Sequence, residues 1–228
     1  MNNFILGNSD FLEHKKSLTI LLISDSHGNI PVLESIIAEF APSCDMLVFC
    51  GDGAADFWQI FSAAAVFDGE DGKLALPPFV ALARGNGDFI NYPMHDFSSI
   101  FSGDTQYRKF HFQVPERVLF SSAGKMILAE HGHKYDVGAG IERLAAAASI
   151  MDADLVFYGH THVPAISEVG GTVFVNPGSC SLPRGGKPAC FAVVSFPGTV
   201  ERFDVRFYEI GYKGGTRGAS FEFKPFHP

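Results

Sequence analysis

Three apolar segments in the first half of the chain each run into a polar, glycine-rich loop. The segments are residues 18–23, 46–50 and 79–83, and the loops begin Ser-Asp-Ser-His-Gly-Asn, Gly-Asp-Gly and Arg-Gly-Asn-Gly-Asp. A short apolar run between polar and glycine residues is typical of a buried strand. Residues 30–40 and 54–67 lie between these runs and carry apolar side chains at helical spacing. The pattern predicts a β-α-β-α-β unit with a parallel sheet.

The second half of the chain favours antiparallel strands. Its expected elements are hairpins at 117–129 and 164–175, a helix at 141–150, and strands at 155–157, 190–196 and 200–207. Residues 89–108 contain Pro93 and Gly103 and predict an irregular excursion, either a lid or a substrate-facing segment. The sequence therefore indicates one mixed α/β domain over residues 1–228.

The ends of this domain are expected to differ from its core. The core spans about residues 18–207, after an N-terminal extension at 1–17. The tail at 211–228 is rich in Gly, Lys and Phe without clean periodicity, which predicts a loosely packed or strand-adding terminus.

The charge of the chain limits its partners. A formal net charge of −8 provides no concentration of Lys and Arg for nucleic acid or an anionic membrane. We therefore expect no stable nucleic-acid or membrane binding, and an anionic substrate needs a local source of positive charge. The N-terminus has no signal-peptide pattern, and no apolar run is long enough to span a bilayer. A cytoplasmic protein is expected, and an oligomer is compatible with the sequence.

The four cysteines are expected to be reduced and mostly buried. Cys44, Cys50, Cys180 and Cys190 show neither Cys-x-x-Cys spacing nor the density of a disulfide scaffold.

Seven side chains able to bind metal stand at predicted strand ends beside glycines. They are Asp25, His27, Asp52, Asn86, His131, His160 and His162. In α/β sheets, ligands bind outside the carboxyl ends of the strands, so these loops should share one crevice. Two carboxylates, one amide oxygen and four imidazoles suit two transition-metal ions that share a carboxylate. Taken singly, each residue has an ordinary alternative, since Asp caps helices and His forms hydrogen bonds in cores.

The ordered motifs resemble the calcineurin-like metallophosphoesterases, most of all their small bacterial and archaeal phosphodiesterase branch. In chain order they are Asp25-Ser26-His27-Gly28-Asn29, Gly51-Asp52, Gly85-Asn86-Gly87-Asp88, His131-Gly132-His133, Gly159-His160-Thr161-His162 and Asn176-Pro177-Gly178-Ser179. The resemblance spans about residues 18–207. It implies a four-layer α/β/β/α sandwich with two mixed β-sheets and a dinuclear metal site at the strand ends.

The same resemblance implies a ligand assignment. The first ion would be held by Asp25, His27 and His162, the second by Asn86, His131 and His160, and Asp52 would bridge the two. The branch favours Mn²⁺, with Fe, Zn and Ni as rivals. The implied activity is that of a binuclear metal-dependent phosphodiesterase acting on a small phosphate ester, in which hydroxide between the ions attacks phosphorus in line.

The position after the asparagine ligand departs from the wider superfamily. Many members carry a His there as the acid for the leaving group, whereas this chain has Gly87. His133 is the candidate replacement, either as a substrate contact or acid, or as a residue that only orients His131. Asn29 is a candidate substrate ligand or a helix cap, and Arg184 is a candidate phosphate ligand. Asn86 is a candidate substrate ligand as well as a metal ligand. The neighbouring Asp88 is expected to stabilise its loop.

Two alternatives to a phosphodiesterase stay open. The fold also serves as a protein-binding scaffold in the retromer complex, where the metal pocket is incomplete. A nucleotide phosphatase or dinucleoside polyphosphate hydrolase would use the same ligand set. The filled ligand positions favour an enzyme, while the vacant acid position at Gly87 keeps the scaffold in view.

Overall fold

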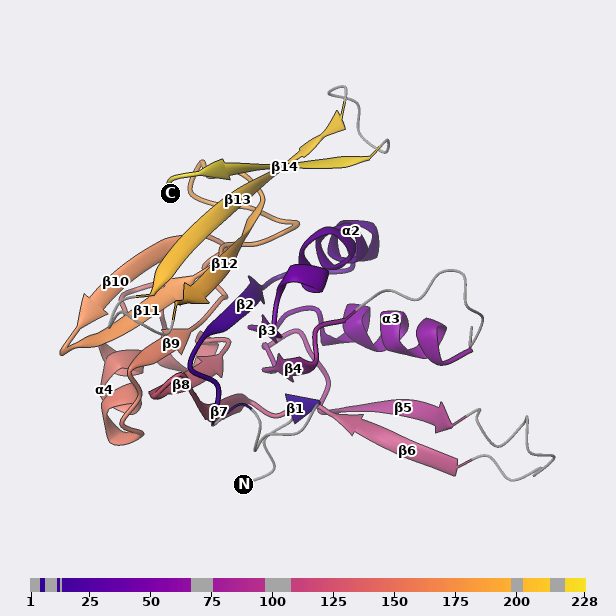
Figure 1. Cartoon of the computed structure of the whole chain (residues 1–228), viewed down its shortest axis with the longest axis horizontal. Helices are drawn as coiled ribbons and strands as arrows, with labels where there is room; N and C mark the ends of the chain where they lie inside the picture. The colour runs from indigo at the N-terminus through magenta and orange to yellow at the C-terminus, as the bar shows by residue number, and fades with distance from the viewer. Residues whose placement is uncertain are drawn as a thin grey trace.

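Two β-sheets form the centre of the computed structural model, which describes residues 5–6, 12, 14–66, 76–96, 108–197, 203–213 and 220–228 (Figure 1). In spatial order the larger sheet contains β1 (Ile5–Leu6), β4 (Phe79–Leu82), β3 (Met46–Phe49), β2 (Leu18–Ile23), β12 (Cys190–Phe196), β13 (Asp204–Tyr212) and β14 (Phe221–Phe226). The smaller sheet contains β10 (Ala165–Val169), β11 (Thr172–Asn176), β9 (Leu155–Phe157), β8 (Lys125–Glu130) and β7 (Arg117–Ser122). Both sheets combine parallel and antiparallel pairs.

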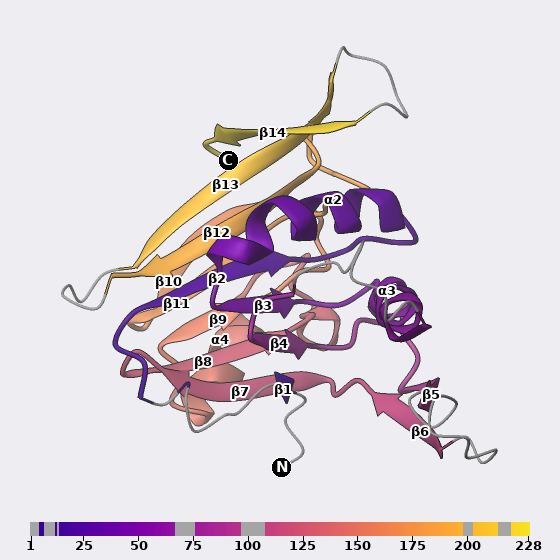
Figure 2. The same cartoon turned by 45° about the vertical axis from the view of Figure 1, so that its right-hand side comes forward.

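Helices cover the outer faces of both sheets and complete four layers (Figures 1 and 2). Along β2 the side chains alternate, with Ile20 and Leu22 packed toward the smaller sheet and Leu21 and Ile23 packed toward α2 (Ile30–Phe40) and α3 (Ala54–Val66). Burial on both faces explains the continuous apolar run in the sequence. Helix α4 (Glu142–Ile150) packs on the outer face of the smaller sheet. The α/β/β/α sandwich is confirmed.

The register of the parallel strands brings their carboxyl ends to one edge. Ile23 at the end of β2 pairs with Phe49 of β3, which pairs with Leu82 of β4. In the smaller sheet, Phe157 of β9 lies between Ala129 of β8 and Val175 of β11, again in parallel. The loops that carry the predicted metal ligands leave these strand ends. The predicted β-α-β-α-β unit is confirmed by β2, α2, β3, α3 and β4.

The prediction of an irregular segment at 89–108 is wrong in part. Strands β5 (Asn91–Asp96) and β6 (Arg108–Gln113) form an antiparallel ribbon. The carbonyl oxygen of Pro93 on this ribbon accepts a hydrogen bond from Trp58 Nε1 at 2.7 Å. In the sequence, the proline and many polar residues obscure the alternation that would mark these strands. Residues 97–107 between them lie outside the described part.

The C-terminal strands also differ from expectation. The strand predicted at 200–207 begins at Asp204 and continues to Tyr212, while residues 198–202 lie outside the described part. The tail adds β14 to the edge of β13, so it takes the strand-adding form. The two-residue strand β1, which pairs with β4, is too short for a sequence pattern to reveal.

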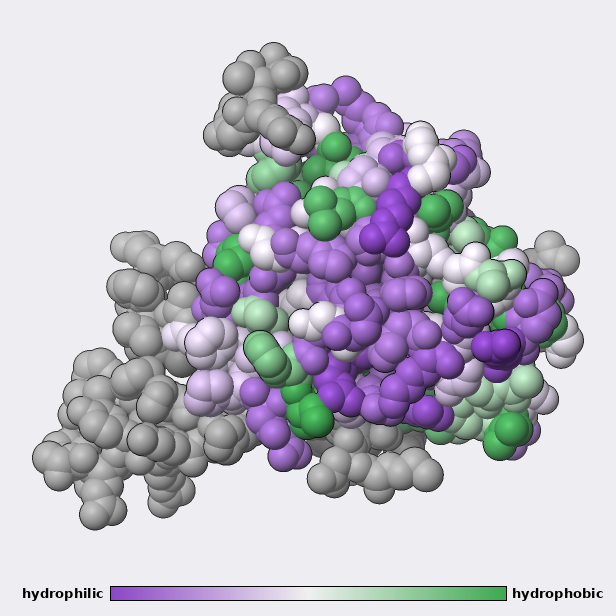
Figure 3. Space-filling view, turned by 180° about the vertical axis from the view of Figure 1, so that it is seen from behind, coloured by the Kyte–Doolittle hydropathy of each residue, from purple (hydrophilic) through white to green (hydrophobic). Residues whose placement is uncertain are grey.

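All four cysteines are buried and free. No helix in the described residues has the length and apolar character needed to cross a membrane. Figure 3 shows the face behind that of Figure 1, where hydrophobic residues lie in scattered small groups within a largely hydrophilic surface.

Candidate metal centre

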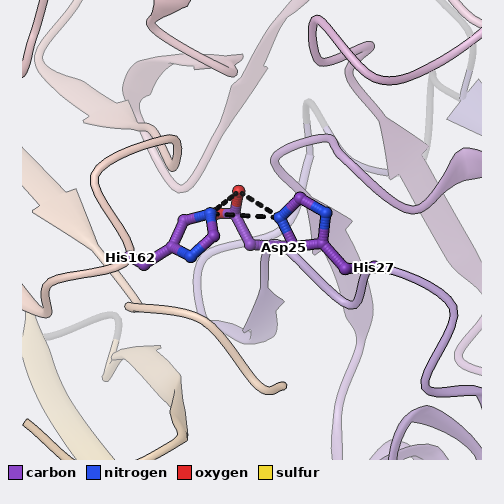
Figure 4. A group of neighbouring side chains, drawn as sticks. All are labelled: Asp25, His27 and His162. Atoms are coloured by element: carbon purple, nitrogen blue, oxygen red, sulfur yellow. Dashed lines mark hydrogen bonds and ion pairs between the residues drawn. The ribbon is translucent and has the colours of Figure 1, made fainter. Parts of the chain in front are cut away.

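Asp25, His27 and His162 converge on one point, although His162 is far from the others in sequence (Figure 4). His162 Nε2 lies 3.1 Å from Asp25 Oδ1 and 3.1 Å from His27 Nε2. His27 Nε2 lies 3.6 Å from the same Asp25 oxygen. Three ligand atoms from loops after β2 and β9 therefore face each other, as two nitrogens and one oxygen around a transition-metal ion would.

A second group contains Asp52 and His131 together with Asp25. His131 Nε2 lies 3.4 Å from Asp52 Oδ2 and 4.0 Å from Asp25 Oδ1. The Asp52 oxygen is also 4.0 Å from His27 Nε2, so it lies between the two groups. His160 joins this group, because its Nδ1 is 3.3 Å from His131 Nε2.

Both carboxylates use one oxygen for the protein and turn the other toward the imidazoles. Asp25 Oδ2 accepts hydrogen bonds from Ser24 Oγ at 2.5 Å and from the backbone N–H of His160 at 3.1 Å. Its Oδ1 is buried and has no hydrogen-bond partner. Asp52 Oδ1 accepts a bond from the backbone N–H of Gly87 at 2.7 Å. A buried carboxylate oxygen without a donor is costly, and a cation at that place would remove the cost.

Backbone carbonyls orient two of the imidazoles. His131 Nδ1 lies 2.7 Å from the carbonyl oxygen of Cys50, and His162 Nδ1 lies 2.5 Å from that of Leu182. A carbonyl only accepts, so each Nδ1 carries the proton and each Nε2 is free to present a lone pair. Both Nε2 atoms are the ones that face the carboxylates.

The backbone at the predicted ligands is left-handed. Eight non-glycine residues in the described part have positive φ, and five of them are predicted ligands. Their φ angles are 56° at Asp25, 44° at His27, 56° at Asp52, 68° at His160 and 60° at His162. Such conformations cost free energy for non-glycine residues and persist only where the surrounding structure imposes them, which is common at functional sites.

Asp88 and Asp56 hold the loops in this conformation. The carboxylate of Asp88 accepts hydrogen bonds at 2.8–2.9 Å from the backbone N–H groups of Asp52, Gly53, Ala54 and Gly85. This confirms the expectation that Asp88 stabilises its loop. The buried Asp56 accepts bonds from Ser26 Oγ at 2.5 Å and from the N–H of Gly28 at 2.9 Å, on either side of His27.

Sequence reasoning missed Ser24 and Asp56. Ser24 precedes a ligand directly, and Asp56 stands in the first turn of α3, where an acidic residue is ordinarily explained by the helix dipole. The glycines of the motifs have a clearer role. A Cβ at Gly85 would lie 2.1 Å from Asp52 Oδ1, and one at Gly159 would lie 2.0 Å from Ser24 Oγ. Only glycine allows these loops to approach so closely.

The charges of the cluster are mutually stabilised. Burial raises the pKa of Asp25, but the neighbouring imidazoles of His162 and His27 outweigh it and hold that pKa well below its usual range. Burial likewise opposes ionisation of Asp52, but the nearby His131 lowers its pKa. The Asp25 carboxylate in turn raises the pKa of His27. The cluster therefore favours ionised carboxylates beside protonated imidazoles or another positive charge.

The four remaining predicted site residues lie in the loops that follow β4, β8, β2 and β11. Asn86 is exposed on the loop of Gly87. The ring of the half-buried His133 lies 5.4 Å from that of His131 and 6.2 Å from that of His160, and burial lowers its pKa. Asn29 caps α2, with Oδ1 3.4 Å from the N–H of Val32. Arg184 is exposed, and its backbone N–H donates to the carbonyl of His162 at 3.2 Å.

Comparison with known proteins agrees with the motifs. The calcineurin-like phosphoesterase superfamily domain matches residues 18–198. The probable metallophosphoesterase YsnB of Bacillus subtilis is 26% identical over 84% of this chain and 91% of its own. The phosphodiesterase YfcE of Escherichia coli K12 is 27% identical over 78% of this chain and 87% of its own. The structure of Vps29 from Chaetomium thermophilum aligns over 92% of this chain and 98% of its own, with a TM-score of 0.57 and 17% identity.

Proposed function

This chain belongs to the calcineurin-like phosphoesterase superfamily, and we propose that it is a binuclear metal-dependent phosphodiesterase. One observation carries the proposal. Asp25 Oδ1 is buried without a hydrogen-bond donor, while the Nε2 atoms of His27, His131 and His162 lie within 4.0 Å of it. This arrangement suits a cation better than a proton shared among these groups.

The proposed ligand sets are those of the sequence motifs. Asp25, His27 and His162 would hold one ion, and His131, His160 and Asn86 the other, with Asp52 shared. The nitrogen-rich set favours a transition-metal ion over Ca²⁺. We propose Mn²⁺ because the family branch that the motifs resemble favours it, with Fe, Zn and Ni as rivals. Two such ions would lower the pKa of a water molecule and neutralise charge on the phosphoryl oxygens during in-line attack.

The residues of the chain orient the reacting groups. The Cys50 and Leu182 carbonyls fix the rings of His131 and His162, and the N–H of Gly87 fixes Asp52. We propose that His133 contacts the leaving oxygen from its place beside His131 and His160. Because Gly87 offers no acid, the enzyme should prefer activated phosphodiesters to alkyl phosphomonoesters. Arg184 and Asn29 are proposed as weaker substrate contacts.

The experiment that tests this function combines metal analysis with turnover. Purified protein is assayed for bound metal and for hydrolysis of bis(p-nitrophenyl) phosphate, with and without added Mn²⁺. We expect Mn²⁺-dependent hydrolysis and close to two ions per chain. If the protein binds no metal and shows no Mn²⁺-dependent turnover, the proposed enzymatic function is refuted.

The role of His133 is tested by the His133→Ala variant, with Arg143→Ala on the exposed face of α4 as the matched control. We expect the loss to be larger for an alkyl ester than for a p-nitrophenyl ester, because a good leaving group needs less help from an acid. Full activity of the variant on both esters would show that His133 takes no part in the reaction.

A protein-binding scaffold is the second candidate function. The likeness to Vps29 and the missing acid at Gly87 favour it. A panel of phosphodiesters, phosphomonoesters and nucleotides in the presence of Mn²⁺ separates the candidates, because a scaffold turns over none of them. Preferred turnover of nucleotides would instead support a nucleotide phosphatase.

The free thiols of all four cysteines support the expected cytoplasmic location.

A further inference from the structure

Large apolar side chains are exposed on two of the loops that carry the candidate metal centre. Phe89 is 73% exposed and Ile90 is 55% exposed, and both directly follow the Asn86–Asp88 segment. Leu182 is 53% exposed, and its carbonyl oxygen accepts the hydrogen bond from His162 Nδ1. Single exposed apolar residues are ordinary, but three on the loops that carry one polar centre call for a common explanation.

The backbone of Phe89 is fixed although its ring is in solvent. Its N–H donates to the hydroxyl of the buried Tyr92 at 3.0 Å. The preceding Asp88 is bound to four backbone N–H groups. The Phe89 ring meets Tyr92 edge-on at 6.3 Å, and Tyr92 stacks on Trp58 at 6.1 Å. An aromatic ring on a fixed backbone loses little conformational entropy when another ring packs on it.

The loops of the exposed apolar residues are connected to the ligand cluster through two different candidate ligands, Asp52 and His162. The N–H of Gly87 binds Asp52, and the Cα atom of Phe89, two residues later, lies within roughly 7 Å of that of Gly87. The carbonyl oxygen of Leu182 accepts a hydrogen bond from His162, which belongs to the group of Asp25 and His27. A phosphodiester likewise carries two ester groups on one phosphorus, whereas a phosphomonoester carries only one.

We propose that Phe89, Ile90 and Leu182 form an apolar rim that binds the ester groups of the substrate. The rim would select phosphodiesters with apolar ester groups, and a planar aromatic group, such as an aryl ring or a nucleobase, would pack on Phe89. This inference rests on the proposed phosphodiesterase function. It concerns specificity, so the rim is expected to act mainly on substrate binding.

The test compares the wild type with Phe89→Ala, Phe89→Trp and Leu182→Ala, using Ile150→Ala as control. Ile150 is 85% exposed at the end of α4 and belongs to neither loop. For bis(p-nitrophenyl) phosphate with Mn²⁺, we expect Phe89→Ala to raise KM by roughly three- to tenfold with kcat changed by less than about twofold. Phe89→Trp should keep KM near the wild-type value, and Leu182→Ala should raise it.

A second diester separates the aromatic contact from a general effect. With ethyl p-nitrophenyl phosphate, in which one aryl group is replaced, the rise in KM caused by Phe89→Ala should be smaller. An equal rise for both diesters would place Phe89 against the p-nitrophenyl leaving group that they share, and an unchanged KM for the aryl diester would contradict the proposed rim.

Binding without turnover keeps this inference distinct from the proposed function. Calorimetry on Mn²⁺-loaded protein compares phenylphosphonate with methylphosphonate, neither of which is a phosphate ester. The wild type should bind the phenyl compound more tightly, and Phe89→Ala should lose that preference. If neither diester is hydrolysed but the wild type still prefers phenylphosphonate, the proposed enzymatic function is contradicted and the proposed binding role of the rim is supported. If the wild type binds the two phosphonates equally, the proposed role of the rim is contradicted, whether or not the diesters are hydrolysed.

Discussion

His160 and His162 are separated by one residue, yet their imidazoles face different partners. His160 Nδ1 lies beside His131 Nε2, whereas His162 Nε2 lies beside Asp25 Oδ1. Left-handed backbone at both residues permits this divergence. The Gly159–His162 turn is thus placed to serve both proposed ions, one through each ring.

This divergence predicts the outcome of two substitutions. In His162→Ala the ion held with Asp25 should be lost first, and in His160→Ala the ion held with His131 should be lost first. Metal content after Mn²⁺ loading and desalting should fall from about two ions per chain to about one in each variant. Equal loss of both ions in either variant would contradict the split assignment.

Asp88 is predicted to matter for stability as well as for the site. Asp88→Ala leaves the N–H groups of Asp52, Gly53, Ala54 and Gly85 without their acceptor. Hydrogen bonds to a charged group contribute more than neutral ones, so the free energy of unfolding should fall by about 3 kcal/mol. Urea unfolding measures this fall.

The control for this measurement is Glu34→Ala, which removes an exposed carboxylate from the surface of α2. Surface substitutions of this kind usually change the free energy of unfolding by less than about 0.5 kcal/mol. A change as small as this in Asp88→Ala would contradict the role of Asp88.

For individual residues, the sequence predicts which side chains cluster better than it predicts their geometry. Six of the seven proposed ligands have side chains that meet in the structure, because strand register brings their loops to one edge. The left-handed backbone, the carbonyls that orient His131 and His162, and the support from Asp56 all depend on contacts distant in sequence. No local pattern encodes those contacts.

Among the elements, the strands buried on both faces are the ones that the sequence predicts most closely. Strand β2 and helix α2 have the predicted bounds, since a short apolar run between polar residues marks the strand and a proline in the first turn marks the helix. The ribbon β5–β6 and the edge strand β14 are less visible. They pair at the margin of the fold, where polar residues and proline interrupt alternation.

Strand β14 is predicted to contribute to stability through its aromatic face. Phe223 lies 5.5 Å from Phe40 of α2 and 5.5 Å from Phe191 of β12, measured between ring centroids. Because Phe223 is only partly buried, Phe223→Ala should lower the free energy of unfolding by about 2 kcal/mol, less than a fully buried phenylalanine. Lys224→Ala, exposed on the same strand, is the control. Equal unfolding midpoints for both variants would mean that the strand adds little.

For the whole molecule, the candidate centre joins the two sheets. Asp25, His27 and Asp52 follow strands of the larger sheet, and His131, His160 and His162 follow strands of the smaller one. The apolar core between the sheets lies behind this edge. Binding of metal at the centre should therefore stabilise the packing of one sheet on the other.

Metal removal tests this coupling. At an ion concentration about 100 times the dissociation constant, a ligand that binds only the folded state adds about 2.7 kcal/mol. For a chain of this size, this corresponds to a rise in Tm of about 5–10 °C between EDTA-treated and Mn²⁺-loaded protein. Differential scanning calorimetry measures the shift. It should be smaller in Asp25→Asn, which keeps the proposed ligands of the second ion, and an unchanged Tm in the wild type would contradict metal binding at this edge.

The position of the centre between the sheets also has a topological consequence. An ion held by Asp25, His27 and His162 would link Asp25 to His162 across 137 positions of the chain. Closing so long a loop restricts the unfolded ensemble, which is the effect usually ascribed to a disulfide. All four thiols are free, so the chain would obtain such a cross-link without oxidation. Its strength would then follow the supply of metal rather than the redox state of the surroundings.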